Sequence, residues 1–314
     1  MSEANTPTVL LSHPMLSFME PVLAAEGWRA VKAWEPPQAG REAVRAIVHP
    51  GEVRLTPPFL ESFPRLGLIA CMSVGYDGVD VAWCRAHGVE VTHASSLNAD
   101  DAAEHALGLV IAGWREIVVG DRMVRAGEWT ERRRLPIRPS LKGRRLGIVG
   151  LGAIGQAAAV RAEAFGLEIG WWDPWPKPEA PWARHASLLD LARWSDILLV
   201  AARADEANRE LISREVIEAV GPEGMIVNIA RGALLDEDAL IAALRDGRVG
   251  RAALDVFQRE PTPSERWAGV PNTVLTPHAA GVTADATARM VEQTMENLRC
   301  FFAGRPLVSP VPPA

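Results

Sequence analysis

Short apolar runs alternate with amphipathic stretches along the first third of the chain. Apolar residues dominate positions 8–11, 45–48, 66–72 and 89–92, each about the length of a buried strand. Between these runs, residues 15–26 and 79–87 carry apolar side chains at the spacing of a helix with one buried face. Strands that alternate with helices are typical of a parallel sheet covered on both faces. We therefore predict a small α/β domain in this part of the chain.

The same alternation returns in the second half of the chain. Strands are predicted at 168–172, 196–200, 225–228, 252–255 and 273–276, with helices such as 187–195 and 237–245 between them. Residues 99–116 are apolar on nearly every side, which predicts a long helix buried between layers or domains. A second long helix is predicted at 284–302, and the proline-rich residues 305–314 cannot continue it.

A glycine-rich turn opens this second unit. An apolar strand runs into Gly150, Gly152 and Gly155, and an alanine-rich helix follows. In this G-x-G-x-x-G pattern the first glycine permits a tight turn, the second lets the backbone approach a pyrophosphate, and the third lets the helix pack closely on the strand. The N–H groups of Ala153 and Ile154 then lie at the positive end of the helix dipole, where a phosphate binds. The pattern predicts a dinucleotide-binding Rossmann domain.

Asp173 stands eighteen residues after Gly155, at the end of the next predicted strand. A carboxylate at this place accepts hydrogen bonds from the adenosine ribose hydroxyls and repels a 2′-phosphate, which favours NAD(H) over NADP(H). Two alternatives stay open: Asp173 is a solvated turn residue before Pro174, or Lys177 tolerates a 2′-phosphate.

The mid-chain position of the glycine-rich turn predicts a split architecture. We expect residues 1–98 and 284–314 to form a flavodoxin-like substrate domain. Residues 99–283 are expected to form the doubly wound NAD-binding domain. In such an α/β fold a ligand binds where strand ends and helix ends converge, so we expect a deep cleft between the two domains.

Composition excludes several classes of protein. The chain has 314 residues, a net charge of −6 and 48% hydrophobic residues, which is ordinary for a globular protein and argues against nucleic acid as a partner. Cys71, Cys84 and Cys300 lack the spacing of a zinc site, so no metal is expected, and Cys71 reads as a buried core residue. Without a signal peptide or a long apolar segment, we expect a soluble, cytoplasmic protein that does not bind a membrane.

Three later segments each place a candidate catalytic residue after a strand. These residues are Arg231, Glu260 and His278, and Asp255 precedes Glu260. Reduction of a 2-keto acid needs a proton donor for the developing alkoxide, which His278 supplies. Glu260 would orient His278 and favour its charged form, while the planar guanidinium of Arg231 would hold the substrate carboxylate. Each residue alone is more often structural, but their order downstream of a dinucleotide motif predicts a catalytic site.

These segments resemble the D-isomer-specific 2-hydroxyacid dehydrogenase family over nearly the whole chain. Residues 73–80 resemble the family's substrate loop, in which the backbone amides of Val74 and Gly75 hold the carboxylate. The resemblance implies that Arg231, Glu260 and His278 are catalytic and that Asp255 lies near the nicotinamide carboxamide. It also implies a homodimer and a cofactor site that includes Ile229, Ala230, Arg231, Asp255, His278 and Gly281.

Within the family, residues 11–15 and 304–311 are most similar to the hydroxypyruvate/glyoxylate reductase branch, which predicts glyoxylate and hydroxypyruvate as substrates. Two positions depart from the branch. Asp173-Pro174 replaces a Ser-Arg pair suited to NADPH, and Asn208 replaces a Thr that commonly helps to hold the cofactor. Trp171, Trp172 and Trp175 are expected in the core, with one of them as a candidate neighbour of the adenine.

Three further interpretations stay open. The chain could act on a phosphorylated or aromatic 2-hydroxy acid, or it could be an NAD-sensing regulatory protein of the corepressor type, which shares this fold. For the dimer, the apolar faces of residues 102–111 and 290–298 are candidate interfaces.

Overall fold

The structure, a computed structural model, describes residues 6–36 and 41–312. The chain folds as two compact units. Unit 1 comprises Met1–Leu97 and Ala284–Ala314, and unit 2 comprises Asn98–Thr283. This division differs at one residue, Asn98, from the two domains predicted from the sequence. Residues 1–5, within the stretch searched for a signal peptide, and residues 313–314, within the proline-rich end, lie outside the described residues.

Unit 1 contains a parallel five-stranded sheet in the order β2-β1-β3-β4-β5, which is the flavodoxin-like order. Its strands are β1 (Thr8–Leu11), β2 (Arg29–Lys32), β3 (Val44–His49), β4 (Leu68–Cys71) and β5 (Glu90–Thr92). Its helices are α1 (Met19–Ala25), α2 (Pro57–Glu61), α3 (Val81–Ala86) and α11 (Ala284–Phe302). Apolar clusters cover both faces of the sheet, so the central strands are buried on both sides, and Cys71 is buried as expected.

The elements of unit 1 depart from the sequence prediction in two ways: one predicted helix is broken, and α2 and β2 were not predicted. The helix predicted at 15–26 is broken into a 3-10 turn, η2 (Pro14–Leu16), and the shorter α1. The His13 side chain caps this turn by accepting a hydrogen bond from the Met15 N–H. Pro21 has no N–H and is tolerated only in the first turn of a helix, so α1 begins just before it. Strand β2 was not predicted, because it lies at the sheet edge and only Val31 of its side chains is buried.

Unit 2 contains a parallel seven-stranded sheet in the order β12-β11-β10-β9-β6-β7-β8. The strands are β6 (Arg145–Val149), β7 (Glu168–Trp172), β8 (Ala183–Arg184), β9 (Ile197–Val200), β10 (Met225–Asn228), β11 (Arg251–Leu254) and β12 (Thr273–Leu275). The strand order reverses between β6 and β9, which is the doubly wound Rossmann arrangement. The predicted fold class is confirmed.

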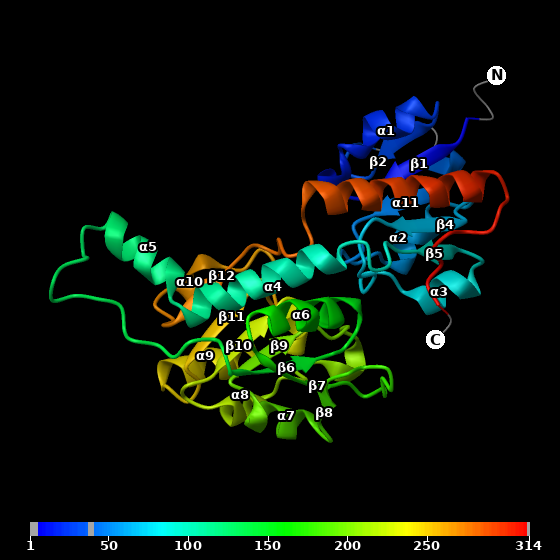
Figure 1. Cartoon of the computed structure of the whole chain (residues 1–314). Coiled ribbons are helices and arrows are strands. Elements are labelled where there is room, and N and C mark those ends of the chain that lie inside the picture. The colour runs from blue at the N-terminus through cyan, green and yellow to red at the C-terminus, as the bar shows by residue number, and fades with distance from the viewer. Residues whose placement is uncertain (1–5, 37–40, 313–314) are drawn as a thin grey trace. The chain divides into compact units, whose positions relative to one another are not determined.

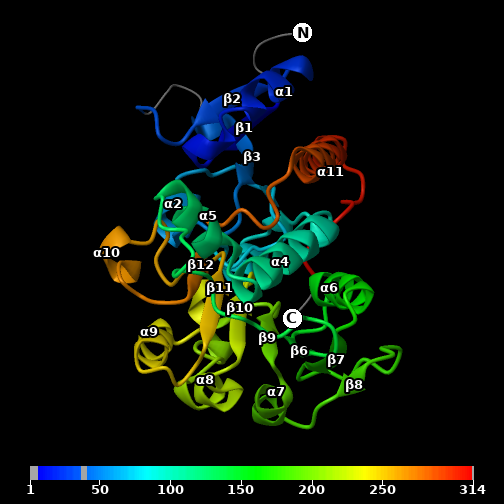
Figure 2. The same ribbon diagram turned by 60° about the vertical axis from the view of Figure 1, so that its left-hand side comes forward.

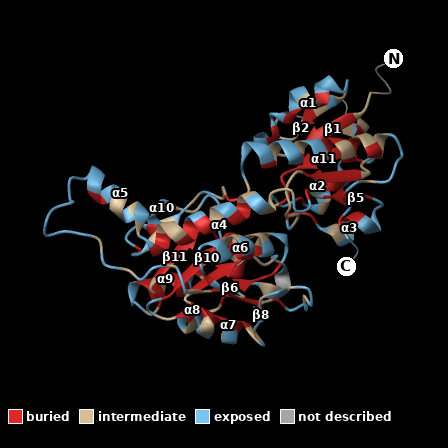
Figure 3. Cartoon of the chain, viewed as in Figure 1, coloured by how far each residue is buried: buried red, intermediate tan, exposed pale blue. Residues whose placement is uncertain are grey.

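Helices cover both faces of this sheet (Figures 1 and 2). On one face α4 (Ala99–Trp114) and α6 (Ala153–Ala164) share an apolar core with the strands. On the other face lie α7 (Leu188–Trp194), α8 (Arg214–Val220) and α9 (Glu237–Arg245). The short α10 (Ser264–Trp267) follows β11. Figure 3 shows the buried strands between exposed outer helix faces.

Helix α4 is less buried than its sequence predicts. Asp100, Glu104 and Gly108 form an exposed stripe along it, and Arg161 of α6 pairs with the two carboxylates at 2.8 and 3.4 Å. The apolar residues at 102–111 pack into the core of unit 2, and those at 290–298 pack into unit 1. Both apolar faces are therefore used inside the units, which corrects their prediction as a dimer interface. No helix within the described part of the chain is long and apolar enough to cross a bilayer.

A segment that the sequence analysis did not predict follows α4. Helix α5 (Ile117–Arg125) and the connection to β6 extend beyond the sheet of unit 2 (Figure 1). Large apolar side chains are exposed along this segment: Ile117, Val119, Val124, Trp129 and Ile137. Residues 131–134, a run of one glutamate and three arginines, are exposed within it.

Candidate active site

The candidate catalytic residues follow adjacent strands of unit 2. Arg231 follows β10, Asp255 and Glu260 follow β11, and His278 follows β12. Because these strands are parallel neighbours, their carboxyl ends meet at one edge of the sheet. Ligands of doubly wound proteins bind at this edge.

His278 and Glu260 form a close pair. The Nδ1 of His278 lies 2.6 Å from Oε2 of Glu260, and both side chains are 32% exposed. The second oxygen of Glu260, Oε1, accepts a hydrogen bond from the Phe257 N–H at 2.9 Å. The Glu260 carboxylate is thus held by a backbone N–H of its own loop and at the same time bonds to the His278 imidazole.

The charge of Glu260 is stabilised by this arrangement. Burial by itself raises the pKa of a carboxyl group. Here the hydrogen bonds from His278 and from the Phe257 N–H, with the charges of His278 and Arg231, outweigh burial and lower the pKa of Glu260. Because the coupling between two titrating groups is mutual, the Glu260 carboxylate favours the protonated form of His278.

The backbone at His278 adopts a left-handed conformation, with φ of 52°, which is uncommon for a residue other than glycine. Asp255 holds the loop in this conformation. Its backbone oxygen accepts the His278 N–H at 2.8 Å, and its carboxylate accepts the N–H groups of Ala279 and Ala280 at 2.9 and 2.8 Å. The Thr276 hydroxyl donates to the same carboxylate at 2.5 Å.

Asp255 is therefore an anchor of the catalytic loop. Its side chain is 0% exposed, and His105 of α4 lies 3.4 Å from Oδ1 and 3.0 Å from the Thr276 hydroxyl. Burying a carboxylate is tolerated because protein donors surround both of its oxygens. Contact between Asp255 and a nicotinamide carboxamide stays a prediction.

Arg231 is held by an equivalent anchor one strand away. The buried Asn228 donates from Nδ2 to the Arg231 carbonyl at 3.0 Å and accepts the Ala230 N–H at 3.0 Å. A side chain at Gly232 would lie 1.8 Å from the carbonyl carbon of Phe257, so only glycine permits this approach. The Arg231 loop is thereby packed against the segment that carries Glu260.

Sequence reasoning did not assign a role to Asn228 or to His105. A polar residue that ends an apolar strand, as Asn228 does, is a usable signal. His105 gives no such signal, because its neighbours Thr276 and Asp255 come from distant parts of the chain.

The glycine-rich turn fits a dinucleotide pyrophosphate. Gly150 has φ of 90°, and a Cβ there would lie 2.5 Å from Cα of Ala202. A Cβ at Gly155 would lie 2.2 Å from the Gly150 oxygen, so α6 packs directly on the turn. Within the described part of the chain, no other residue lies within 4 Å of a Cβ placed at Gly152, and no side chain caps α6. The helix therefore begins at an open backbone surface where an anion can approach.

Asp173 follows β7 and lies against this turn. It is 8% exposed, and its Oδ2 accepts the Leu151 N–H at 3.1 Å. Its Oδ1 accepts the Trp175 N–H at 2.9 Å, so Asp173 also stabilises the turn that follows it. Trp171 is a core residue, whereas Trp175 is exposed. The Asn208 side chain bonds within its own loop, to Arg203 O and to the Asp205 N–H, both at 2.8 Å.

The remaining cofactor candidates lie on the same strand-end loops. Ile229 is buried after β10, and Ala230 is half-buried. The α-carbon of Gly281 is packed so closely that a Cβ there would lie 2.1 Å from Nδ2 of Asn98.

In unit 1 the loop with Val74 and Gly75 follows β4. Among the described residues, the backbone N–H groups of these two donate to no protein acceptor. His93 lies with Nδ1 3.0 Å from the Val74 oxygen, and the Ser73 hydroxyl donates to the Gly75 oxygen at 2.6 Å. The loop thus keeps two backbone donors available while its carbonyl groups are occupied.

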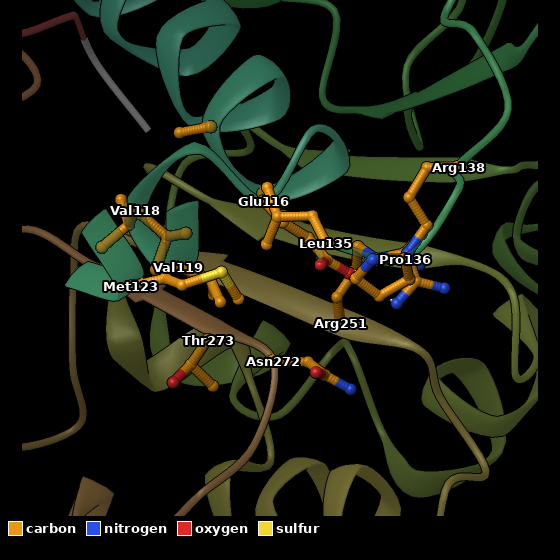
Figure 4. Close-up of a pocket in the computed structure, with 13 residues that line it drawn as sticks. Glu116, Val118, Val119, Met123, Leu135, Pro136, Arg138, Arg251, Asn272 and Thr273 are labelled. Carbon is orange, nitrogen blue, oxygen red and sulfur yellow. Dashed lines mark hydrogen bonds and ion pairs between the residues drawn. The ribbon is translucent and has the colours of Figure 1, made fainter. Parts of the chain in front are cut away.

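A cavity of about 250 Å³ lies elsewhere in unit 2 (Figure 4). Its lining includes Met123, Leu135, the ion pair of Glu116 with Arg138, and Arg251 at the start of β11. Because it opens at the amino end of β11, it is separate from the strand ends that carry Arg231 and His278.

Comparisons with known proteins agree with this geometry. Residues 107–280 match the family described as D-isomer specific 2-hydroxyacid dehydrogenase, NAD binding domain. Glyoxylate/hydroxypyruvate reductase HPR3 of Arabidopsis thaliana is 35% identical, and the match covers 99% of both chains. Hydroxyphenylpyruvate reductase of Plectranthus scutellarioides is 37% identical over 96% of this chain and 98% of its own.

Solved structures give the same result. A 2-hydroxyacid dehydrogenase from Ketogulonicigenium vulgare Y25 has a TM-score of 0.90 and 37% identity, over 98% of this chain and 99% of its own. An NADPH-dependent glyoxylate/hydroxypyruvate reductase from Sinorhizobium meliloti, in complex with NADP and malonate, has a TM-score of 0.88 and 31% identity, over 97% and 96% of the chains. The sequence-based family assignment is confirmed, and with it a nicotinamide cofactor. The chain belongs to the D-isomer-specific 2-hydroxyacid dehydrogenase family of oxidoreductases, in its hydroxypyruvate/glyoxylate reductase-like branch.

Proposed function

We propose that this protein reduces glyoxylate or hydroxypyruvate to the corresponding D-2-hydroxy acid, with NADH as the preferred reductant. The observation that carries the proposal is the 2.6 Å pair of His278 and Glu260, at the sheet edge that also presents Arg231. A charged imidazole beside a guanidinium suits a substrate with a carboxylate next to a carbonyl.

Each residue has a defined task in this proposal. The N–H groups of Val74 and Gly75, with the Arg231 guanidinium, bind the substrate carboxylate. A reduced nicotinamide dinucleotide, held at the glycine-rich turn of Gly150, Gly152 and Gly155, would supply the hydride for the carbonyl carbon. His278, bound through Nδ1 to Glu260, donates the Nε2 proton to the carbonyl oxygen as it becomes an alkoxide. Glu260 stabilises the charged imidazole before the proton leaves, and afterwards it favours the uptake of a proton from solvent that restores the donor.

A preference for NAD(H) rests on Asp173. Its carboxylate stands at the end of β7 and beside the glycine-rich turn, where ribose hydroxyls are bound in this fold. The Sinorhizobium meliloti relative is described as NADPH-dependent, so the two cofactors must be compared directly. We expect kcat/KM to be higher with NADH than with NADPH. In an Asp173→Ser variant the ratio of these two values should be smaller. Faster turnover of the unaltered protein with NADPH would contradict the role of Asp173.

The function is tested with a panel of 2-keto acids while NADH oxidation is followed by absorbance. Glyoxylate and hydroxypyruvate should give the highest kcat/KM. Hydroxyphenylpyruvate is the second candidate, because a hydroxyphenylpyruvate reductase matches this chain over 96% of its length. If hydroxyphenylpyruvate exceeds both small acids, that second candidate replaces the first. If no 2-keto acid is turned over, a regulatory protein that senses NAD becomes the better interpretation.

We also propose that the protein is a homodimer, with the second copy covering the exposed apolar side chains on residues 117–137. Monomeric proteins rarely leave such a group of apolar side chains in water. Sedimentation should give twice the chain mass of 34.0 kDa, and a double variant, Trp129→Asp with Ile137→Asp, should give the single chain. A single-chain mass for the unaltered protein would refute the dimer.

A further inference from the structure

Glu237 is a buried carboxylate that the catalytic mechanism does not use. It is the first residue of α9, where a glutamate is ordinarily a solvated partner of the helix dipole. Here its side chain is 1% exposed. A buried carboxylate is tolerated only when protein donors satisfy it, so its partners identify what it holds.

Both partners of Glu237 belong to the segment that carries Glu260. Oε1 accepts the backbone N–H of Gln258, which lies two residues before Glu260. Oε2 accepts Nε of Arg266 at 2.6 Å, in α10 and six residues after Glu260. One carboxylate on α9 therefore holds the segment on both sides of Glu260.

Further contacts attach the segment around Glu260 to the residues just before α9. The Gln258 side chain donates from Nε2 to the Leu235 oxygen at 2.9 Å. Trp267, at the end of α10, is buried in the core and contacts the Phe257 ring edge-on, with ring centroids 5.8 Å apart. The Phe257 N–H in turn holds Oε1 of Glu260. The Glu237 contacts are thus continuous with the contacts that aim Glu260 at His278.

From this geometry we propose that Glu237 is a positioning residue, which acts through Gln258 and Arg266 to set the distance between Glu260 and His278. The inference rests on the proposed function, since it concerns the proton that His278 donates. Displacing Glu260 weakens the attraction that holds this proton, so loss of the Glu237 contacts lets His278 deprotonate at lower pH.

Other charged groups near the pair are left unchanged by this test. They are Arg231 after β10, and Asp255 with His105 behind the His278 loop. Asp238 offers a matched control, because its carboxylate also pairs with Arg266, through Nη2, at 3.0 Å. Asp238 is 85% exposed, and among the described residues its side chain has no other ion pair with the Glu260 segment.

The experiment compares the unaltered protein with Glu237→Gln and Asp238→Asn. Two quantities are measured against pH: kcat/KM for reduction of the keto acid, and the NMR titration of the His278 ring in protein without cofactor. In Glu237→Gln, both the loss of activity at high pH and the His278 titration should move to lower pH by about 0.5 unit or more. The dissociation constant of NADH should change less than twofold, and Asp238→Asn should match the unaltered protein.

A Glu237→Gln protein with unchanged activity profile and unchanged His278 titration would overturn the inference. An equal shift in Asp238→Asn would also overturn it, since surface charge would then explain the effect. If Glu237→Gln does not fold by circular dichroism, Arg266→Gln tests the same anchor from its half-exposed side and should shift the titration in the same direction. Absence of turnover in the unaltered protein would refute the proposed function, while the His278 titration would still decide the role of Glu237.

Discussion

The carboxylate of Asp255 fixes the loop from which His278 projects. Asp255 directly follows β11 and is buried in unit 2, and its carboxylate accepts the two N–H groups that directly follow His278. The same residue accepts the His278 N–H through its backbone oxygen. The proposed proton donor is therefore held in an uncommon backbone conformation by a side chain that is fully buried behind it.

Substitution of Asp255 should destabilise the protein as well as reduce its activity. Asp255→Ala leaves the Ala279 and Ala280 N–H groups and the Thr276 hydroxyl without their acceptor, and unsatisfied buried groups cost about 1–3 kcal/mol each. Urea denaturation should therefore show a free energy of unfolding lower by about 3 kcal/mol or more. Asp121→Asn, which alters an exposed pair with Arg125, is the control and should stay within about 0.5 kcal/mol. Equal stability of the two variants would contradict the anchor.

Replacing the proposed proton donor should remove most of the catalysis while leaving the fold intact. His278→Ala should lower kcat by about 10²- to 10⁴-fold, which is the usual contribution of a positioned acid. Glu260→Gln keeps the size of the side chain and should give a smaller loss, because His278 remains. Stopped-flow hydride transfer with glyoxylate gives the rates, and quenching of intrinsic tryptophan fluorescence by NADH gives cofactor binding. Nearly full activity in His278→Ala would show that another group donates the proton.

The pH dependence of reduction should follow the coupling between Glu260 and His278. Reduction requires protonated His278, so kcat/KM falls as pH rises through its pKa. Glu260→Gln removes the carboxylate that favours the proton, and the fall should move to lower pH. A profile that is unchanged, or moved to higher pH, would be inconsistent with the 2.6 Å pair.

The same coupling predicts how stability varies with pH. The pKa of Glu260 is lowered from its ordinary value of 4.5, so its contribution is fully present above that pH. The contribution is lost as the pH falls through the lowered pKa of the folded state. The difference in melting temperature between the unaltered protein and Glu260→Gln should therefore shrink on acidification below 4.5. A difference that grew on acidification would contradict the direction of the shift.

Two glycines of the turn should respond differently to alanine. Gly150→Ala places a Cβ 2.5 Å from the Ala202 backbone at φ of 90°, so the free energy of unfolding should fall by roughly 1–3 kcal/mol. Gly152→Ala meets open space, so its stability should be unchanged, but the new methyl group stands where the pyrophosphate approaches. Its dissociation constant for NADH should rise at least tenfold, measured by fluorescence titration. Unchanged NADH binding in Gly152→Ala would mean that the turn does not hold the pyrophosphate.

Much of the fold was predictable because buried parallel strands leave a strong local signal. The strand at 168–172 and the helices at 237–245 and 284–302 have the bounds predicted from the sequence. Elements with few buried side chains were missed, such as β2 at a sheet edge and α5. In these elements too few positions are buried to impose a regular spacing of apolar residues. The helix at 99–116 was predicted to be buried on nearly every side. In the structure it has an exposed stripe, and Arg161 from another helix forms ion pairs with the carboxylates of that stripe.

By itself, the sequence determined the family, the α/β class and the residue types of the candidate site. Those properties depend on local patterns: a glycine-rich turn after a strand, and Arg231, Glu260 and His278 after later strands. Only the tertiary structure decided how these residues are held. Asn228, Asp255 and Glu237 each anchor one catalytic loop through hydrogen bonds to groups elsewhere in the chain. The packing of strands and helices decides which groups these side chains hold, so the local sequence around each anchor does not identify its partners.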